Sequence, residues 1–251
     1  MERVQLWSSG GGTQSVAIAA LISTGALPRP DISVIVDTER ERAEVWDYHD
    51  KYVAPALRNV DVTLHRVPKS QFATVDLYRN EDLLIPAFTN ENGGIGKLPT
   101  YCSNEWKKRV VRRFASTIYP KETLFNTWIG FSIDEIKRVY QEPGKWHPIF
   151  PLIDLRMSRS DCYRLVEKMG WPRPPKSSCW MCPNRSHDDW MDMKKNHPEE
   201  WEKAVAFEEE IRTKDDAVFL HRDGVPLPEV KTKKEQGDLF TGRCDSGYCF
   251  T

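Results

Sequence analysis

The segment Arg3–Leu21 constrains the fold of this chain more than any other part of the sequence, because it reads as a strand, a glycine-rich turn and a helix. Three consecutive glycines, Gly10-Gly11-Gly12, form the turn, and an apolar run of good helix formers follows Ser15. A ligand can approach the backbone N–H groups of such a turn closely, because no Cβ blocks it. The positive end of the helix dipole adds to this effect, so the segment predicts an anion-binding site; a flexible strand-to-helix connection is the alternative.

Hydroxyl groups beside the glycines favour phosphate as the anion. The turn lacks the Gly-Lys-Ser/Thr ending of a Walker loop and the glycine spacing of the dinucleotide-binding fingerprint. It resembles the pyrophosphate-binding loop S-G-G-x-D-S of the PP-loop ATP pyrophosphatases, in which Gly11, Gly12 and Ser15 match and Gln14 replaces the Asp. This resemblance implies that ATP is bound by Ser9, Gly10, Gly11, Gly12, Thr13, Gln14 and Ser15, and that Ser15 also takes part in catalysis.

A regular alternation of strands and helices follows the first helix. Ile32–Asp37 reads as an apolar strand, residues 44–52 as a helix and residues 60–67 as a third strand. This alternation predicts an α/β fold with a doubly wound, mostly parallel sheet. Asp37 and Thr38 end the second strand, at the edge where such sheets bind ligands, or they cap a helix.

Four further stretches resemble the phosphoadenosine-phosphosulfate (PAPS) reductase-like branch of the PP-loop superfamily, whose fold is that of the adenine nucleotide alpha hydrolases. Asp37-Thr38 is similar to the V-D-T after the second strand of that branch, which implies contact with the nucleotide. Cys102, Ser103, Trp106 and Lys107 fall onto its C-T-x-x-L-K element, and Gly130, Asp134, Glu135 and Arg138 onto G-I-R-x-D-E-S-x-x-R. Residues 148–154 are similar to its P-L-x-x-W segment. The resemblance implies catalytic roles for Lys107 and Arg138, and nucleotide contacts for Gly130 and Glu135.

A basic face is predicted on the helix after Cys102. Its cations are Lys108, Arg109, Arg112 and Arg113. Such a run is either a solvated face or a local site for a polyanion. The formal net charge of −1 and a pI of about 6.6 argue against a global basic field, so a nucleic-acid partner would need a local patch.

The six cysteines predict a metal or cluster site or a redox dithiol, because we expect a cytoplasmic chain, in which disulfides are rare. Cys179-Trp-Met-Cys182 is followed by a proline, and such a pair binds one metal ion or one cluster from a tight loop. Cys102, Cys244 and Cys249 are the available further ligands, whereas Cys162 is expected to be buried in a helix. Resemblance to iron–sulfur sulfonucleotide reductases implies a [4Fe–4S] cluster, with Zn²⁺ as the alternative.

Two domains are expected, a PP-loop nucleotide-binding domain at 1–185 and a small C-terminal extension at 186–251 that carries the last two cysteines. The extension contains a helix that starts at Pro198 and a hairpin at 219–227. Residues 68–100 show weak periodicity, and within them Asn90–Gly96 reads as a flexible loop or lid. No apolar run has membrane-spanning length and no signal peptide precedes the first strand, so neither membrane association nor secretion is expected.

The resemblance implies an ATP pyrophosphatase that uses Mg²⁺, forms an adenylate and releases pyrophosphate. The favoured function is sulfur insertion into nucleic acid, DNA or tRNA, with DNA phosphorothioation preferred. The expected partners are a cysteine desulfurase or other proteins of a modification complex. Reduction of PAPS or its unphosphorylated cousin is the alternative, although the tail Cys-Asp-Ser-Gly-Tyr-Cys-Phe-Thr departs from the E-C-G-L/I-H-like tail of reductases. A nucleotide-sensing subunit without activity is a further alternative, because Gln14 replaces the loop Asp.

Overall fold

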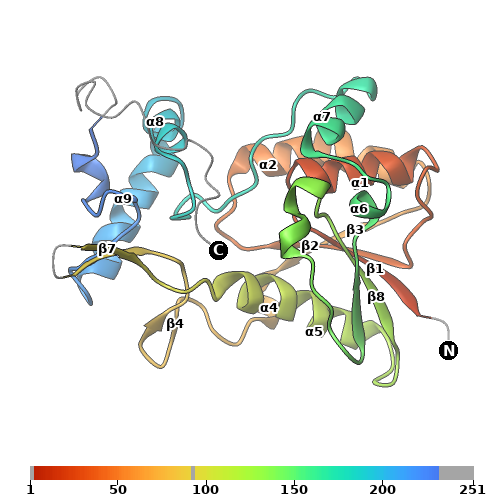
Figure 1. The fold of residues 1–251 in the computed structure, drawn as a ribbon, viewed down its shortest axis with the longest axis horizontal. Helices are drawn as coiled ribbons and strands as arrows, with labels where there is room; N and C mark the ends of the chain where they lie inside the picture. The colour runs from red at the N-terminus through yellow and green to blue at the C-terminus, as the bar shows by residue number, and fades with distance from the viewer. Residues whose placement is uncertain (1–2, 92–93, 232–251) are drawn as a thin grey trace. The chain divides into compact units, whose positions relative to one another are not determined.

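The computed structural model describes residues 3–91 and 94–231, which form two compact units (Figure 1). The first unit combines the chain up to Thr74 with Asn104–Ser178, and the second combines Val75–Ser103 with the chain from Cys179 onward. A single boundary after residue 185 was expected from the sequence. The division is instead discontinuous, because a strand from residues 75–103 pairs with a strand from the C-terminal segment.

The first unit is built on a five-stranded sheet in which every neighbouring pair is parallel. Its strands are β1 (Val4–Ser9), β2 (Ile32–Asp37), β3 (Leu64–Pro68), β8 (Phe125–Ile129) and β9 (Trp146–Ile149). Their spatial order is β3-β2-β1-β8-β9, so the chain winds outward from β1 in both directions. This arrangement confirms the predicted doubly wound, mostly parallel α/β fold.

Helices cover both faces of this sheet (Figure 1). The helices of the first unit are α1 (Thr13–Ser23), α2 (Ala43–Tyr48), α3 (Ala54–Arg58), α4 (Lys69–Phe72), α5 (Arg109–Ile118), α6 (Pro151–Asp154) and α7 (Arg159–Lys168). Successive strand residues point to opposite faces. Trp7 therefore packs in one core with α1 and α7, and Leu6 packs in the other with Val110 and Val111 of α5.

Local sequence signals explain several helix ends. Ser158 and Asp161 form a capping box at the start of α7, in which each side chain accepts from the other residue's backbone N–H. The helix after Cys102 is only partly regular, because Ser103–Lys108 form a π-helical turn before α5 begins. A second π-helical turn, His49–Val53, joins α2 to α3, and a 3-10 turn, Ile133–Arg138, follows β8.

The second unit contains a three-stranded antiparallel sheet and two helices. Its elements are β4 (Tyr78–Arg79), β5 (Asp82–Leu83), β6 (Phe88–Glu91), β7 (Gly94–Lys97), α8 (His187–Asn196), α9 (Pro198–Arg212), β10 (Val218–Phe219) and a 3-10 turn at Leu227–Glu229. The sheet order is β10-β6-β7, and β4 pairs with β5 alone. Pro198 opens α9 as predicted.

Two expectations for this unit were wrong. The flexible loop expected at Asn90–Gly96 is instead part of the β6–β7 pair, in which Asn90 lies opposite Ile95 and Glu91 opposite Gly94. No hairpin forms at 219–227, because β10 ends at Phe219 and pairs with β6, while the residues after it turn and enter the 3-10 segment. Among the described residues, none of the helices combines the length and the apolar character needed to cross a membrane.

Candidate functional site

The candidate site lies where the strand order of the parallel sheet reverses, between the ends of β1 and β8. The glycine turn follows β1, and Gly130 follows β8. A Cβ on Gly130 would lie 3.5 Å from Ser15 Oγ and 3.6 Å from Gln14 Cβ, so the two segments are in contact. Open parallel sheets bind ligands at such a switch point. The structure thus brings together the two motifs that the sequence placed in one site.

The hydroxyl groups of two flanking serines stabilise the glycine turn. Gly10 N–H donates to Ser15 Oγ at 2.8 Å, and Gly11 N–H donates to Ser9 Oγ at 3.3 Å. Gly12 is the N-cap of α1 and contributes no side-chain cap, so the first N–H groups of this 11-residue helix have no intrahelical acceptor. The start of α1 therefore offers N–H donors suited to an anion, and Ser9 and Ser15 stabilise the shape of the turn.

Gly11 is the residue of the turn that cannot carry a side chain at low cost. Its φ is +78°, in the left-handed region. An added Cβ would lie 3.1 Å from Ser177 Oγ and 3.4 Å from Ile35 Cδ1. A larger residue at this position therefore combines backbone strain with close contacts.

His49 contacts the carbonyl oxygen of Gly11 in the glycine turn, and the sequence analysis did not predict this residue. The buried imidazole lies with Nε2 3.0 Å from the carbonyl oxygen of Gly11. Burial lowers the pKa of His49 below its ordinary value, so the ring is neutral at pH 7 and Nε2–H donates to that oxygen. No sequence motif marks this residue, because its partner is a backbone atom 38 positions away.

Ser177 and Glu41 form a second contact with the turn that the sequence did not predict. The Ser177 hydroxyl lies 2.9 Å from the carbonyl oxygen of Gly10 and 3.1 Å from Glu41 Oε2, and it donates to one of them at a time. The other oxygen, Glu41 Oε1, is buried and has no hydrogen-bond partner among the described residues. A buried carboxylate oxygen with this unmet capacity is suited to a cation.

Gln14, which replaces the Asp of the PP-loop motif, connects the two halves of the site. Its side-chain Nε2 donates to Glu135 Oε2 at 2.8 Å, and the other Glu135 oxygen accepts from Arg138. Gln14 and Glu135 are both buried. An amide donor is thus complementary to this buried carboxylate, whereas a carboxylate at position 14 would repel it.

Asp37 lies at the expected strand end, but both of its oxygens already have protein partners. Oδ2 accepts from Arg66 Nε at 2.9 Å and from the terminal Arg66 nitrogen at 2.6 Å, while Oδ1 accepts from the Glu39 N–H. Arg66 also stacks on Trp46. Thr38 beside it is buried. The carboxylate of Asp37 therefore orders this strand end, and its predicted contact with a nucleotide stays a prediction.

The predicted basic face of α5 is largely paired within the protein. Lys108 and Arg112 both bind the carboxylate of Glu142, at 2.8 and 2.6 Å. Arg109 pairs with Glu105, and Arg113 donates to the carbonyl oxygen of Phe72. This pairing reduces the charge available to a polyanion below what the sequence suggested. The predicted catalytic Lys107 is half-buried in the π-helical turn.

The three described cysteines proposed as ligands, Cys102, Cys179 and Cys182, all belong to the second unit, and none of them is in a disulfide with another described residue. Cys182 N–H donates to the carbonyl oxygen of Cys179 at 3.0 Å, so the pair closes the expected tight turn. The N–H of Arg185 donates to the carbonyl of Cys182, and its guanidinium donates to that of Cys179. Cys244 and Cys249 lie outside the described residues.

No protein-family model matches this chain, and no curated protein matches it. Among solved structures, it is similar to the U34-tRNA thiolase NcsA from Methanococcus maripaludis with its [4Fe-4S] cluster. The two are 16% identical, the match covers 92% of this chain and 73% of that one, and the TM-score is 0.45.

Proposed function

We propose that this chain is a PP-loop ATP pyrophosphatase of the PAPS reductase-like branch, an enzyme that activates its substrate by adenylylation. The observation that carries the proposal is the glycine turn at the switch point of the parallel sheet, with Gly130 in contact with it. The phosphates of ATP would lie at the start of α1, and the nucleoside near Asp37, Thr38 and Gly130.

The proposed reaction breaks the bond between the α-phosphorus of ATP and the bridging oxygen to the β-phosphorus. A substrate oxygen bonds to the α-phosphorus, its proton leaves, and pyrophosphate departs. The protein supplies fixed positive charge for this transfer, from the N–H groups of α1 and from Lys107. Mg²⁺ would neutralise the leaving phosphates, and Glu41 supports its placement, because Oε1 is buried without a hydrogen-bond partner among the described residues. Arg138 is tied to Glu135, so we assign it a positioning role in addition to the catalytic role expected of it.

Sulfur insertion is the function that the cysteines support. A [4Fe–4S] cluster on Cys102, Cys179, Cys182 and one of the last two cysteines would hold or pass the sulfur. Lys97 lies close enough to Cys182 for their charges to interact, and a nearby cation stabilises thiolate ligands. The acceptor we propose is nucleic acid, with DNA phosphorothioation ahead of tRNA thiolation, and a cysteine desulfurase as sulfur donor. Because α5 is largely paired, we expect partner proteins to contribute to nucleic-acid binding.

Two alternatives remain distinguishable. Thioredoxin-dependent release of sulfite from PAPS would establish a sulfonucleotide reductase. ATP binding without any turnover would establish a nucleotide-sensing subunit. The Gln14–Glu135 hydrogen bond argues against the inactive nucleotide-sensing subunit, because the glutamine that replaces the motif Asp has a complementary partner.

Substitution of Gly11 by alanine tests the phosphate site. The added Cβ meets Ser177 and forces a non-glycine residue to φ +78°, so we expect ATP affinity to fall at least tenfold in calorimetric titration. Gly25→Ala is the matched control, because Gly25 has φ +74° but no atom within 4 Å of an added Cβ. If the two variants bind ATP equally well, the phosphates are not held at this turn.

A further inference from the structure

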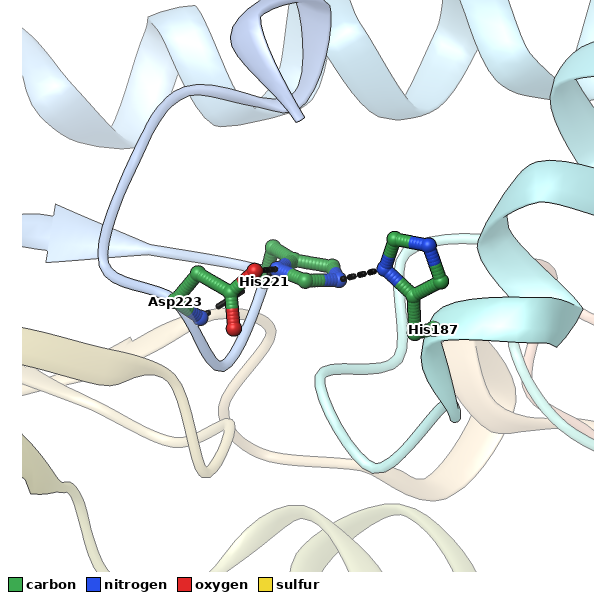
Figure 2. A group of neighbouring side chains, drawn as sticks. All are labelled: His187, His221 and Asp223. Carbon is green, nitrogen blue, oxygen red and sulfur yellow. Dashed lines mark hydrogen bonds and ion pairs between the residues drawn. The ribbon is translucent and has the colours of Figure 1, made fainter. Parts of the chain in front are cut away.

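Two histidines and an aspartate converge in the second unit, and none of them is among the residues assigned to the nucleotide site (Figure 2). His187 opens α8, while His221 and Asp223 lie in the turn after β10. One ligand atom from each of the three lies within 4.8 Å of the other two. His187 Nδ1 lies 3.3 Å from His221 Nε2, and His221 Nδ1 lies 3.5 Å from Asp223 Oδ2.

We propose that His187, His221 and Asp223 bind a divalent transition-metal ion, with Zn²⁺ as the best match to their chemistry. Imidazole nitrogen and carboxylate oxygen are zinc ligands, at about 2.0–2.2 Å. Two nitrogens on one tetrahedral zinc stand about 3.3 Å apart at such bond lengths, and His187 Nδ1 and His221 Nε2 have this separation. The proposal is independent of the nucleotide site and of the cysteines.

The hydrogen bonds of the metal-free group are incomplete. The Asp223 N–H donates to His221 Nδ1 at 3.2 Å, so that nitrogen carries a lone pair, which faces the Asp223 carboxylate. The proton of neutral His221 is then on Nε2 and points to His187 Nδ1. This leaves the N–H of His187 on Nε2, which is buried and has no hydrogen-bond partner among the described residues. A metal ion can take the place of the proton between the two rings, and the Asp223 carboxylate, whose ligand atom lies within 4.8 Å of one nitrogen of each histidine, supplies the third ligand.

The surroundings favour a preformed site. His221 is only 1% exposed, so its ring is held by the surrounding protein. The turn that carries it is anchored on α9, because the buried Glu208 carboxylate accepts from Leu220 N–H at 2.7 Å and from Leu227 N–H at 2.5 Å. Asp223 is 42% exposed and opens the site to solvent. The neighbouring Arg222 is a positive charge that opposes the ion.

Zinc titration of the full chain tests the site, after chelator treatment and dialysis. We expect His187→Gln to lose one equivalent of bound Zn²⁺, and Asp223→Asn, on an exposed side chain, to weaken the same equivalent about 10- to 100-fold. His197→Gln, at the other end of α8, is the matched control and keeps it. Cys179→Ser keeps it as well, which separates this site from any metal on the cysteines.

X-ray absorption at the zinc edge identifies the ligands. A nitrogen and oxygen shell at about 2.0–2.1 Å supports the assignment, and a sulfur shell near 2.3 Å in its place overturns it. Thermal unfolding is a second measurement that does not depend on the His187 variant. If Zn²⁺ raises the unfolding midpoint of the wild type and of His197→Gln, but not that of Asp223→Asn, the proposed site is supported. Equal zinc binding by wild type, His187→Gln and Asp223→Asn, or no zinc binding at all, would show that the three residues form only a hydrogen-bonded chain.

Discussion

Gln14 joins the two segments of the candidate site, the glycine turn after β1 and the segment after β8. Its amide donates to a buried carboxylate on the segment after β8, across 121 positions of sequence. The PP-loop motif has Asp at this position, and an Asp would place a second negative charge beside Glu135. The substitution that most set this sequence apart from the motif is thus explained by its partner.

Replacement of Gln14 by glutamate is expected to separate the two segments. It removes a buried hydrogen bond and sets two carboxylates against each other, which costs about 2–4 kcal/mol of folding free energy. Urea unfolding at pH 7 measures this loss. Gln141→Glu, at an exposed glutamine of the same unit, is the control. Equal stability of the two variants would mean that the Gln14–Glu135 contact does not contribute to the fold.

The residues of the glycine turn could be predicted from sequence because they are consecutive and their chemistry is local. His49 and Ser177 could not, since each contacts a carbonyl oxygen of the turn from a distant part of the chain. The prediction for Ser15 was also incomplete, because it did not include the hydrogen bond that the Ser15 hydroxyl accepts from the Gly10 N–H within the turn. Sequence patterns thus identify the glycine turn but not the distant side chains that support it.

At the scale of elements, the carboxylate of Glu142 ties α5 to the segment that precedes β9. It accepts from both Lys108 and Arg112, which lowers its pKa to about 2, chiefly through the hydrogen bond from Arg112. A carboxyl group whose folded pKa lies below its ordinary value stabilises the fold above that value. Glu142 therefore contributes stability at pH 7 that is lost as the pH falls from about 4.5 to about 2.

We expect Glu142→Gln to lower the unfolding free energy by about 1 kcal/mol at pH 7, a small value because solvent partly screens the pair. The difference from wild type should shrink as the pH approaches 2. Urea midpoints at a series of pH values measure it, with exposed Glu122→Gln as the control. A difference that stays constant with pH would show that the carboxylate charge is not what holds α5 here.

The strands and helices of the first unit could be predicted from the sequence, because apolar strands alternate with helices whose capping residues can be recognised, as at Ser158. The strands of the second unit could not be predicted in this way. β4, β5 and β10 have only two residues each, too short for a periodic pattern, and β6 finds its partner β10 more than 120 positions later. The prediction of a hairpin at 219–227 was wrong for the same reason. The Asp223-Gly224 pair indicated a turn, but nothing in the local sequence indicated that β10 pairs with β6.

At the scale of the whole molecule, the cysteines belong to a unit assembled from two distant segments. Cys102 lies at the penultimate position of the segment Val75–Ser103, and Cys179 begins the C-terminal segment. Shared ligation by these cysteines is implied by the resemblance alone and stays a prediction.

Anaerobic purification with iron and sulfide analysis tests the cluster. We expect about four irons per chain and loss of visible absorption in Cys179→Ser. Cys162→Ala should retain both, because Cys162 is buried in α7 and burial raises its thiol pKa to about 12, which keeps it a neutral apolar side chain. A colourless protein with one tightly bound zinc on these cysteines would contradict the cluster.

The products formed from ATP test the central claim most directly. With ATP labelled separately at the α- and γ-phosphates, Mg²⁺ and the full chain, we predict labelled AMP from the first and labelled pyrophosphate from the second, with neither formed by Gly11→Ala. The Gly25→Ala variant should behave as wild type. Release of ADP and orthophosphate instead would contradict the assignment, because a PP-loop enzyme breaks the bond between the α- and β-phosphates.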